Sequence, residues 1–270
     1  AERIAKGIPA NTTRAYRQAG ERFARWCADN NRAPFPTTSV VLADFVAFLC
    51  DEGLSPSTIR QTMAVVSVAN QANGHPPLGK ETTQDARTAL RGYRKERSDT
   101  GKRERKAPPI TRARLRQMTA ACKDGTLTDK RDRLLLVIGW ALAGRRSELA
   151  ALRIEDVTVD PDGDGGLVIL IRSSKTDKDA EGHHAFVPPG EHTDTDPVGL
   201  FETWLAALGD LGEDVTAGPL FRGITAAGTL RRERTVVSKG GVTLRFGGLS
   251  PEAVNGVVQR AARRAKLPKS

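Results

Sequence analysis

A change of periodicity part-way along the chain is the feature that most limits how this sequence can fold. Through the first hundred residues apolar side chains recur about every 3.6 positions, as in Phe23, Trp26 and Cys27, which is the spacing of an amphipathic helix. Beyond residue 150 the apolar runs are short and bounded by polar turns, as in Leu167–Ile171, which is typical of strands. The sequence therefore predicts a mainly α chain with a small antiparallel sheet.

Start and stop signals divide the first part into four helices. Ser55 precedes Pro56, so a capping side chain is followed by a proline at the first helical position. The Asn73-Gly74 pair stands where that helix is expected to stop. Residues 1–97 are therefore predicted to form a four-helix domain.

The second part mixes helices and strands. Thr111 is expected to cap a helix, and an apolar helix is predicted over residues 129–143. Strand and turn signals follow up to about residue 187, and helices resume after residue 198. The segment 222–248 is rich in Gly and Arg and is expected to be irregular. Residues 110–270 are thus predicted to form a second domain of the α+β type.

Basic residues are concentrated around the junction of these domains. Lys and Arg number 42 against 32 Asp and Glu, a net charge of +10, which favours a polyanionic partner such as nucleic acid. The segment 98–109 has no apolar periodicity and is predicted to be an extended basic linker. A solvated charge run without a partner is the alternative. The candidate DNA-binding residues are Arg60, Arg87, Arg91, Arg94, Lys95, Lys102, Arg103, Arg105, Lys106 and Arg172.

Several classes of protein are excluded by what the sequence lacks. Its longest apolar stretch, residues 134–143, is too short to cross a bilayer. Cys27, Cys50 and Cys122 lie far apart, which indicates reduced, structural thiols rather than disulfides. Neither the cysteines nor the histidines have the spacing of a metal site. We expect a cytoplasmic, DNA-associated protein without a metal, a cofactor or membrane contact.

Two short motifs in the second domain could carry chemistry. Arg145 and Glu148 lie three residues apart just past the long apolar helix, and a guanidinium fork suits two oxygens of one phosphate. Lys175 lies on a predicted hairpin tip, where it could reach a phosphate or protonate a leaving oxygen. Taken separately, each motif is better explained as a surface feature, an ion pair in the first case and a solvated lysine in the second.

Taken together, these features resemble the tyrosine recombinases, the phage-integrase family, over nearly the whole chain. The resemblance is carried by Asn11-Thr-Thr-Arg-Ala-Tyr16, Leu54-Ser-Pro-Ser-Thr-Ile59, Gly144-Arg-Arg-Ser-Glu-Leu149 and Ser174-Lys-Thr-Asp177. It implies a SAM-like core-binding domain over residues 1–97 and the family's catalytic domain over residues 110–270. It also implies that Arg145 and Lys175 are catalytic, with Glu148 in support.

The family's chemistry is site-specific cutting and rejoining of double-stranded DNA through a 3′-phosphotyrosyl intermediate, without a metal or cofactor. The resemblance further implies protomers assembled on DNA, as a tetramer for the complete protein, in a bacterial cytoplasm. The family pattern continues with a His-x-x-Arg pair and a nucleophilic tyrosine, but the chain has no such pair. Its two tyrosines, Tyr16 and Tyr93, precede Arg145 and are expected on apolar helix faces.

We therefore expect a chain that stops before the His-x-x-Arg and Tyr motifs, and that binds DNA without cleaving it. A natural, non-catalytic DNA-binding remnant of a recombinase is the alternative, and the reading frame beyond codon 270 would distinguish the two. A metal-dependent nuclease would need clustered carboxylates on adjoining strands. The acidic turn at Asp162-Gly-Asp164 lacks that setting.

Overall fold

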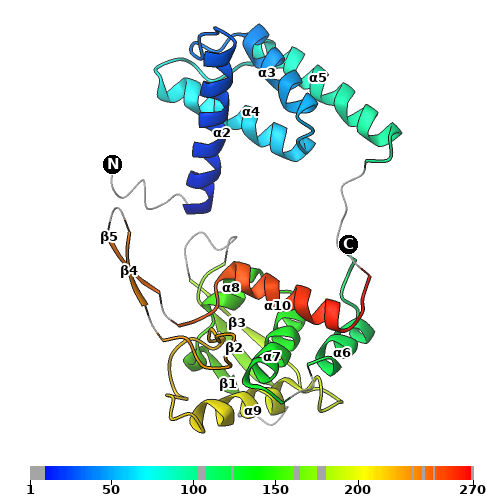
Figure 1. Cartoon of the computed structure of the whole chain (residues 1–270), viewed down its shortest axis with the longest axis vertical. Coiled ribbons are helices and arrows are strands. Elements are labelled where there is room, and N and C mark those ends of the chain that lie inside the picture. Colours follow the sequence, from blue (N-terminus) through cyan, green and yellow to red (C-terminus); the bar gives the residue numbers. More distant parts are fainter. Residues whose placement is uncertain are drawn as a thin grey trace. The chain divides into compact units, whose positions relative to one another are not determined.

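The computed structural model describes most of the chain as two compact units (Figure 1). The described residues are 10–102, 108–122, 125–160, 165–174, 181–232, 234–238, 241–245 and 247–268. The first unit, Ala1–Lys106, is called the N-terminal unit below, and the second, Ala107–Ser270, the C-terminal unit. No described helix is long and apolar enough to cross a membrane.

The N-terminal unit consists of the four predicted helices, which are confirmed. They are α2 (Ala10–Asp29), α3 (Ser39–Asp51), α4 (Pro56–Ala72) and α5 (Lys80–Asp99). The hydroxyl of Thr38 accepts a hydrogen bond from the amide of Val41 to cap α3, and Ser55 caps α4 ahead of Pro56. Helix α5 continues to Asp99, so the first two residues of the predicted linker are helical.

An aromatic cluster forms the core of this unit. The ring centroid of Phe45 lies 5.0 Å from that of Phe23 and 5.3 Å from that of Trp26. Tyr16 was expected to share this buried face, but it is 36% exposed. Among the described positions of α2, the buried residues are Phe23, Trp26 and Cys27. Because they all lie in the second half of the helix, Tyr16 extends beyond the core.

The C-terminal unit combines helices with two small sheets. Its elements are α6 (Arg112–Ala120), α7 (Leu127–Ala141), α8 (Arg146–Ala151), the 3-10 turn η1 (Ile154–Asp156), β1 (Val157–Val159), β2 (Leu167–Ile171), β3 (His183–Val187), α9 (Pro197–Gly209), β4 (Arg234–Ser238), β5 (Gly241–Arg245) and α10 (Pro251–Arg264). Strands β1, β2 and β3 form an antiparallel sheet in that order. The predicted fold class, mainly α with a small antiparallel sheet, is confirmed.

Alternation along the strands gives this sheet one buried face. Leu167, Ile169 and Val187 are nearly inaccessible and pack with Trp204 of α9 and with Phe221. The indole of Trp204 also donates to the carbonyl of Leu220 at 2.8 Å, so the buried ring keeps its hydrogen bond. This core fixes the sheet against α9 and against the segment that follows that helix.

The prediction of an irregular segment over residues 222–248 is wrong. Strands β4 and β5 pair in antiparallel register within it, with Val237 opposite Val242. The strands contain the runs Thr235-Val-Val237 and Val242-Thr-Leu244, which are rich in β-branched residues, and such residues favour strands. The Gly and Arg content of the wider segment obscured these two short runs.

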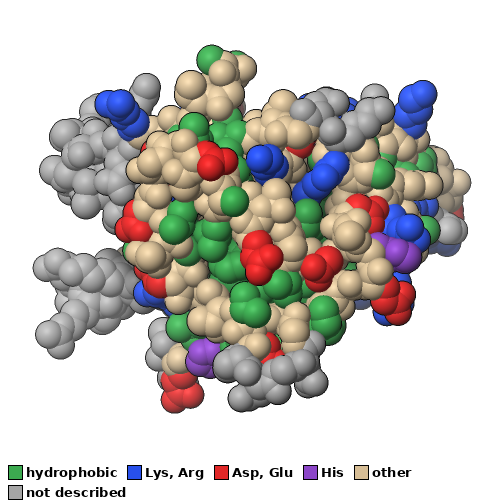
Figure 2. Space-filling model, turned by 90° about the horizontal axis from the view of Figure 1, so that it is seen from below, with side chains coloured by type: hydrophobic (Ala, Val, Ile, Leu, Met, Phe, Trp, Pro, Cys, Tyr) green, Lys and Arg blue, Asp and Glu red, His purple; other side chains and the backbone are tan. Residues whose placement is uncertain are grey.

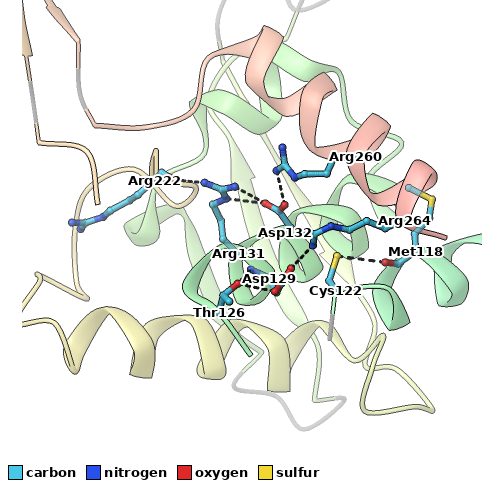
Figure 3. Close-up of polar contacts among 9 residues, drawn as sticks. All are labelled: Met118, Cys122, Thr126, Asp129, Arg131, Asp132, Arg222, Arg260 and Arg264. Carbon is cyan, nitrogen blue, oxygen red and sulfur yellow. Dashed lines mark hydrogen bonds and ion pairs between the residues drawn. The ribbon is translucent and has the colours of Figure 1, made fainter. Parts of the chain in front are cut away.

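Buried charges attach α10 to α7 (Figure 3). On α7, the side chains of Asp129, Arg131 and Asp132 are at most 4% exposed. Arg260 of α10 donates to Asp132 Oδ2 at 2.6 Å, and Arg264 donates to Asp129 Oδ1 at 2.7 Å. The two arginines are one helical turn apart on α10, and each pairs with one buried carboxylate of α7.

Arg131 connects the same network to the segment after α9. Its Nε and Nη2 atoms donate to Asp132 Oδ1 at 3.0 and 2.6 Å, and its Nη1 donates to the carbonyl of Arg222 at 2.9 Å. The hydroxyl of Thr126 donates a further hydrogen bond to Asp129 Oδ2 at 2.7 Å. Because the carboxylates are paired and hydrogen-bonded, their burial is tolerated.

Candidate active site

A tight turn between α7 and α8 presents Arg145. Ala143 adopts a left-handed conformation with φ of 46°, and Gly144 follows it directly. A Cβ at Gly144 would lie 3.2 Å from the Leu149 side chain, and one at Gly139 would lie 3.0 Å from it. The two glycines therefore let Leu149 pack closely against the end of α7, which fixes the start of α8.

Both oxygens of Glu148 hold Arg145. The backbone amide of Arg145 donates to Oε2 at 2.9 Å, and its guanidinium Nη1 donates to Oε1 at 2.8 Å. The Glu148 side chain is 11% exposed and that of Arg145 is 47% exposed. Glu148 thus holds Arg145 through its amide and its guanidinium, while about half of the Arg145 side chain stays open to solvent. This is a geometry in which an arginine can contact an anion without ordering a mobile side chain.

Lys175 lies outside the described residues, so its position relative to Arg145 stays a prediction. The strands that flank its loop are described, and Ile171 pairs with His183 where the loop begins and ends. Gly182 has φ of +71°, and a Cβ there would lie 2.9 Å from the carbonyl oxygen of Ile171. Only glycine fits that position without displacing backbone. The root of the loop is therefore fixed by the sheet.

The candidate DNA-binding residues on α5 share one side of that helix. Arg87, Arg91 and Arg94 are spaced i, i+4 and i+7, and Lys95 is four residues from Arg91, which places them along one stripe. All four are exposed. The buried residues Thr83, Ala86 and Leu90 lie on the adjoining side of the helix, so the stripe runs along the edge of the packed face. The basic stripe is consequently displayed on a well-anchored helix.

The other candidate DNA-binding residues are dispersed. Arg60 on α4 and Lys102 are exposed. Arg172 donates from Nε to Asp156 Oδ1 at 2.7 Å, and its side chain remains 54% exposed. Arg103, Arg105 and Lys106 lie outside the described residues. Because Asp156 is buried, this ion pair gives Arg172 a structural role in addition to the predicted contact with DNA.

Both tyrosines belong to the N-terminal unit. The hydroxyl of Tyr93 donates to the carbonyl of Leu54 at 3.1 Å and accepts from Arg97 Nη1 at 3.1 Å. The guanidinium carbon of Arg97 also lies 5.5 Å from the centre of the Tyr93 ring, a cation–π distance. Tyr93 therefore ties α5 to the loop before α4.

The thiols and acidic groups give no sign of other chemistry within the described residues. Burial, with a further contribution from Asp132 and Asp129, raises the pKa of Cys122 to about 11, so this thiol stays protonated at neutral pH. No group of three or more His, Cys, Asp or Glu among the described residues could hold a metal ion.

Charge is not evenly distributed over the C-terminal unit. Figure 2 shows the lower face of Figure 1, which lies over α9; acidic and hydrophobic side chains occupy its middle, with Lys and Arg mostly around it. Sequence reasoning missed one basic set, Arg222, Arg231 and Arg232, which lines a cleft. Its signal in the sequence was the Arg content of residues 222–248.

Comparison with known proteins gives one informative relative. No family model matches the chain. An integrase/recombinase xerD homolog from Selenomonas ruminantium is 25% identical over 232 residues, which cover 85% of this chain and 64% of the relative. This match supports the tyrosine recombinase family.

A solved structure of XerA recombinase aligns with 14% identity and a TM-score of 0.39, over 100% of this chain and 75% of that one. That score is too low to argue a shared fold, so the tyrosine recombinase assignment rests on the sequence relative. The chain spans 64% of that relative's length.

Proposed function

We propose that this chain acts in site-specific DNA recombination, supplying the DNA-binding unit and part of the active site of a tyrosine recombinase. The observation that carries the proposal is the turn after α7, where Glu148 fixes Arg145 while the Arg145 side chain stays 47% exposed. That arrangement, at the motif shared with the family, suits a phosphodiester whose non-bridging oxygens gain charge during cleavage.

The assigned roles follow from what each group can do. Arg145 donates to a non-bridging oxygen of the phosphate, a contribution typically worth about 2.7–4 kcal/mol per donor. Glu148 positions Arg145. Lys175 protonates the leaving 5′-oxygen. The complete reaction passes through a 3′-phosphotyrosyl intermediate formed by protomers assembled on duplex DNA.

DNA binding by this chain is proposed to depend on the basic stripe of α5. Four phosphate contacts, from Arg87, Arg91, Arg94 and Lys95, give a slope of about −3.6 in log affinity against log salt. Affinity should then fall roughly 100-fold between about 50 and 200 mM salt. Binding that is indifferent to salt would contradict the proposal.

Fluorescence anisotropy with a labelled duplex of about 30 base pairs tests this stripe. The double variant Arg91→Gln/Arg94→Gln should bind more weakly and show a slope reduced by about 1.8. The control is Arg17→Gln/Arg32→Gln, which removes the same charge from arginines of the same unit that pair with Glu21 and Asp44. An equal loss in both variants would show that only net charge matters.

A second candidate function is DNA binding without cleavage by these 270 residues alone. It is favoured by the placement of both tyrosines in the N-terminal unit, where the hydroxyl of Tyr93 is held by Leu54 and Arg97. Incubation with a nicked suicide substrate and denaturing electrophoresis should show no covalent protein–DNA adduct. A protease-sensitive adduct that maps to Tyr16 or Tyr93 would refute this reading.

A further inference from the structure

A basic cleft lies at the root of the β4–β5 hairpin. Its volume is about 760 Å³, and its walls come from residues 211–232 together with Gly247. Arg222, Arg231 and Arg232 line it beside one acidic residue, Glu213, so the lining carries a charge of 3 − 1 = +2. None of these arginines belongs to the active-site turn or to the basic stripe of α5.

Arg222 forms a fixed cationic wall of the cleft. Its side chain is 13% exposed, and it donates from Nη1 to Glu213 Oε2 at 2.5 Å and from Nη2 to the carbonyl of Asp214 at 2.9 Å. Its carbonyl is held in turn by Arg131. The Nε–H of Arg222 is buried without an acceptor among the described residues. A buried donor of this kind calls for an acceptor, which water or an anion in the cleft can supply.

Arg231 and Arg232 differ from Arg222 because their side chains are exposed while the backbone beneath them is fixed. The amide of Arg231 donates to the carbonyl of Gly223 at 2.8 Å, and the amide of Gly223 donates to the carbonyl of Gly247 at 2.6 Å. A Cβ at Gly247 would lie 2.5 Å from the Arg231 carbonyl oxygen. The two ends of the hairpin are therefore locked together beside the cleft.

The β4–β5 hairpin starts beside the cleft. Its register places Arg234 directly across from Arg245. Figure 1 shows β4 and β5 projecting away from the helices of the C-terminal unit. Strand β4 thus begins two residues after the lining residue Arg232, and β5 ends two residues before the lining residue Gly247.

We propose that the basic cleft at the root of the β4–β5 hairpin binds the phosphate backbone of duplex DNA, as a contact surface additional to Arg145 and α5. This inference rests on the proposed function. A nucleic-acid backbone fits better than an acidic protein segment because the exposed arginines need only repeated anionic groups, and the two Nη atoms of Arg222 already have acceptors in Glu213 and Asp214. Arg231 and Arg232 contact phosphates, and Arg222 supplies the fixed wall.

The test is the salt dependence of duplex binding by the whole chain. Arg231→Gln/Arg232→Gln should weaken binding and reduce the slope by about 1.8, the loss expected for two phosphate contacts. Arg231→Lys/Arg232→Lys keeps both charges and should retain most of the slope. The charge-matched control is Arg17→Gln/Arg32→Gln. Both of these arginines lie in the N-terminal unit, where they pair with Glu21 and Asp44. Circular dichroism checks that each variant is folded.

The outcomes separate this inference from the proposed function. If the unaltered chain does not bind duplex DNA, the proposed function fails. If it binds, and Arg231→Gln/Arg232→Gln retains both the affinity and the slope, the inference about the cleft is wrong. A variant that changes the oligomeric state but not DNA binding would also overturn it, because the surface would then be an interface between copies of this chain.

Discussion

Replacing Asp132 with asparagine tests whether the buried ion network carries the stability of the C-terminal unit. The Asp132 side chain is 2% exposed and accepts three hydrogen bonds, two from Arg131 and one from Arg260. Removing one partner of a buried pair costs about 3–5 kcal/mol. The Arg131 side chain is 4% exposed and would keep an uncompensated charge, whereas Arg260 is 36% exposed and water screens it. Arg260→Gln should therefore cost less, about 1 kcal/mol.

Urea denaturation followed by tryptophan fluorescence measures these losses. A Trp26→Phe background leaves Trp140 and Trp204, which both lie in the C-terminal unit. With a slope of about 2 kcal/mol per molar urea, Asp132→Asn should lower the midpoint by about 2 M. A shift below about 0.5 M, or equal shifts for Asp132→Asn and Arg260→Gln, would refute the reasoning.

Three further predictions concern other parts of the chain. Because the folded-state pKa of Cys122 is raised to about 11 from 9.0, the folded protein binds the extra proton, and stability should fall as the pH rises from about 9 towards 11. Thermal unfolding at several pH values checks this, with Cys122→Ala as the variant that loses the dependence. Tyr93→Phe removes the hydroxyl that Arg97 donates to and should cost about 1 kcal/mol in the N-terminal unit, measured by urea titration. Gly182→Ala puts a Cβ 2.9 Å from the Ile171 carbonyl oxygen at positive φ and should destabilise the C-terminal unit by about 1–3 kcal/mol, an effect that Ala at the open position Gly92 should not reproduce.

The sequence was most informative where structure depends on neighbouring residues. Ser55 and Thr111 cap the helices that follow them, as predicted, because a cap bonds an amide three residues ahead. The Arg145–Glu148 pair could likewise be anticipated, since its members are three residues apart at the start of a helix. The antiparallel sheet followed from short apolar runs separated by turns.

Features that join distant parts of the chain could not be predicted. The partners of Asp132 and Asp129 on α10 are 128 and 135 residues away, and no local pattern pairs a buried carboxylate with a particular arginine. Tyr16 was placed in the core because helical spacing gives the face of a helix but not how far its neighbours cover it. The cleft at Arg222 depends on the same kind of tertiary arrangement.

The two ion pairs between α7 and α10 also set the rotation and the axial position of α10. The buried residues of that helix, Val254, Val257 and Ala261, are small, so apolar packing alone discriminates weakly between neighbouring positions. A slide of one turn, about 5.4 Å, would bring Arg264 to the place of Arg260 and leave one buried carboxylate without a cation. A rotation by a single residue would carry both arginines away. The two buried carboxylates therefore select one alignment of α10 out of the several that its hydrophobic face alone would allow.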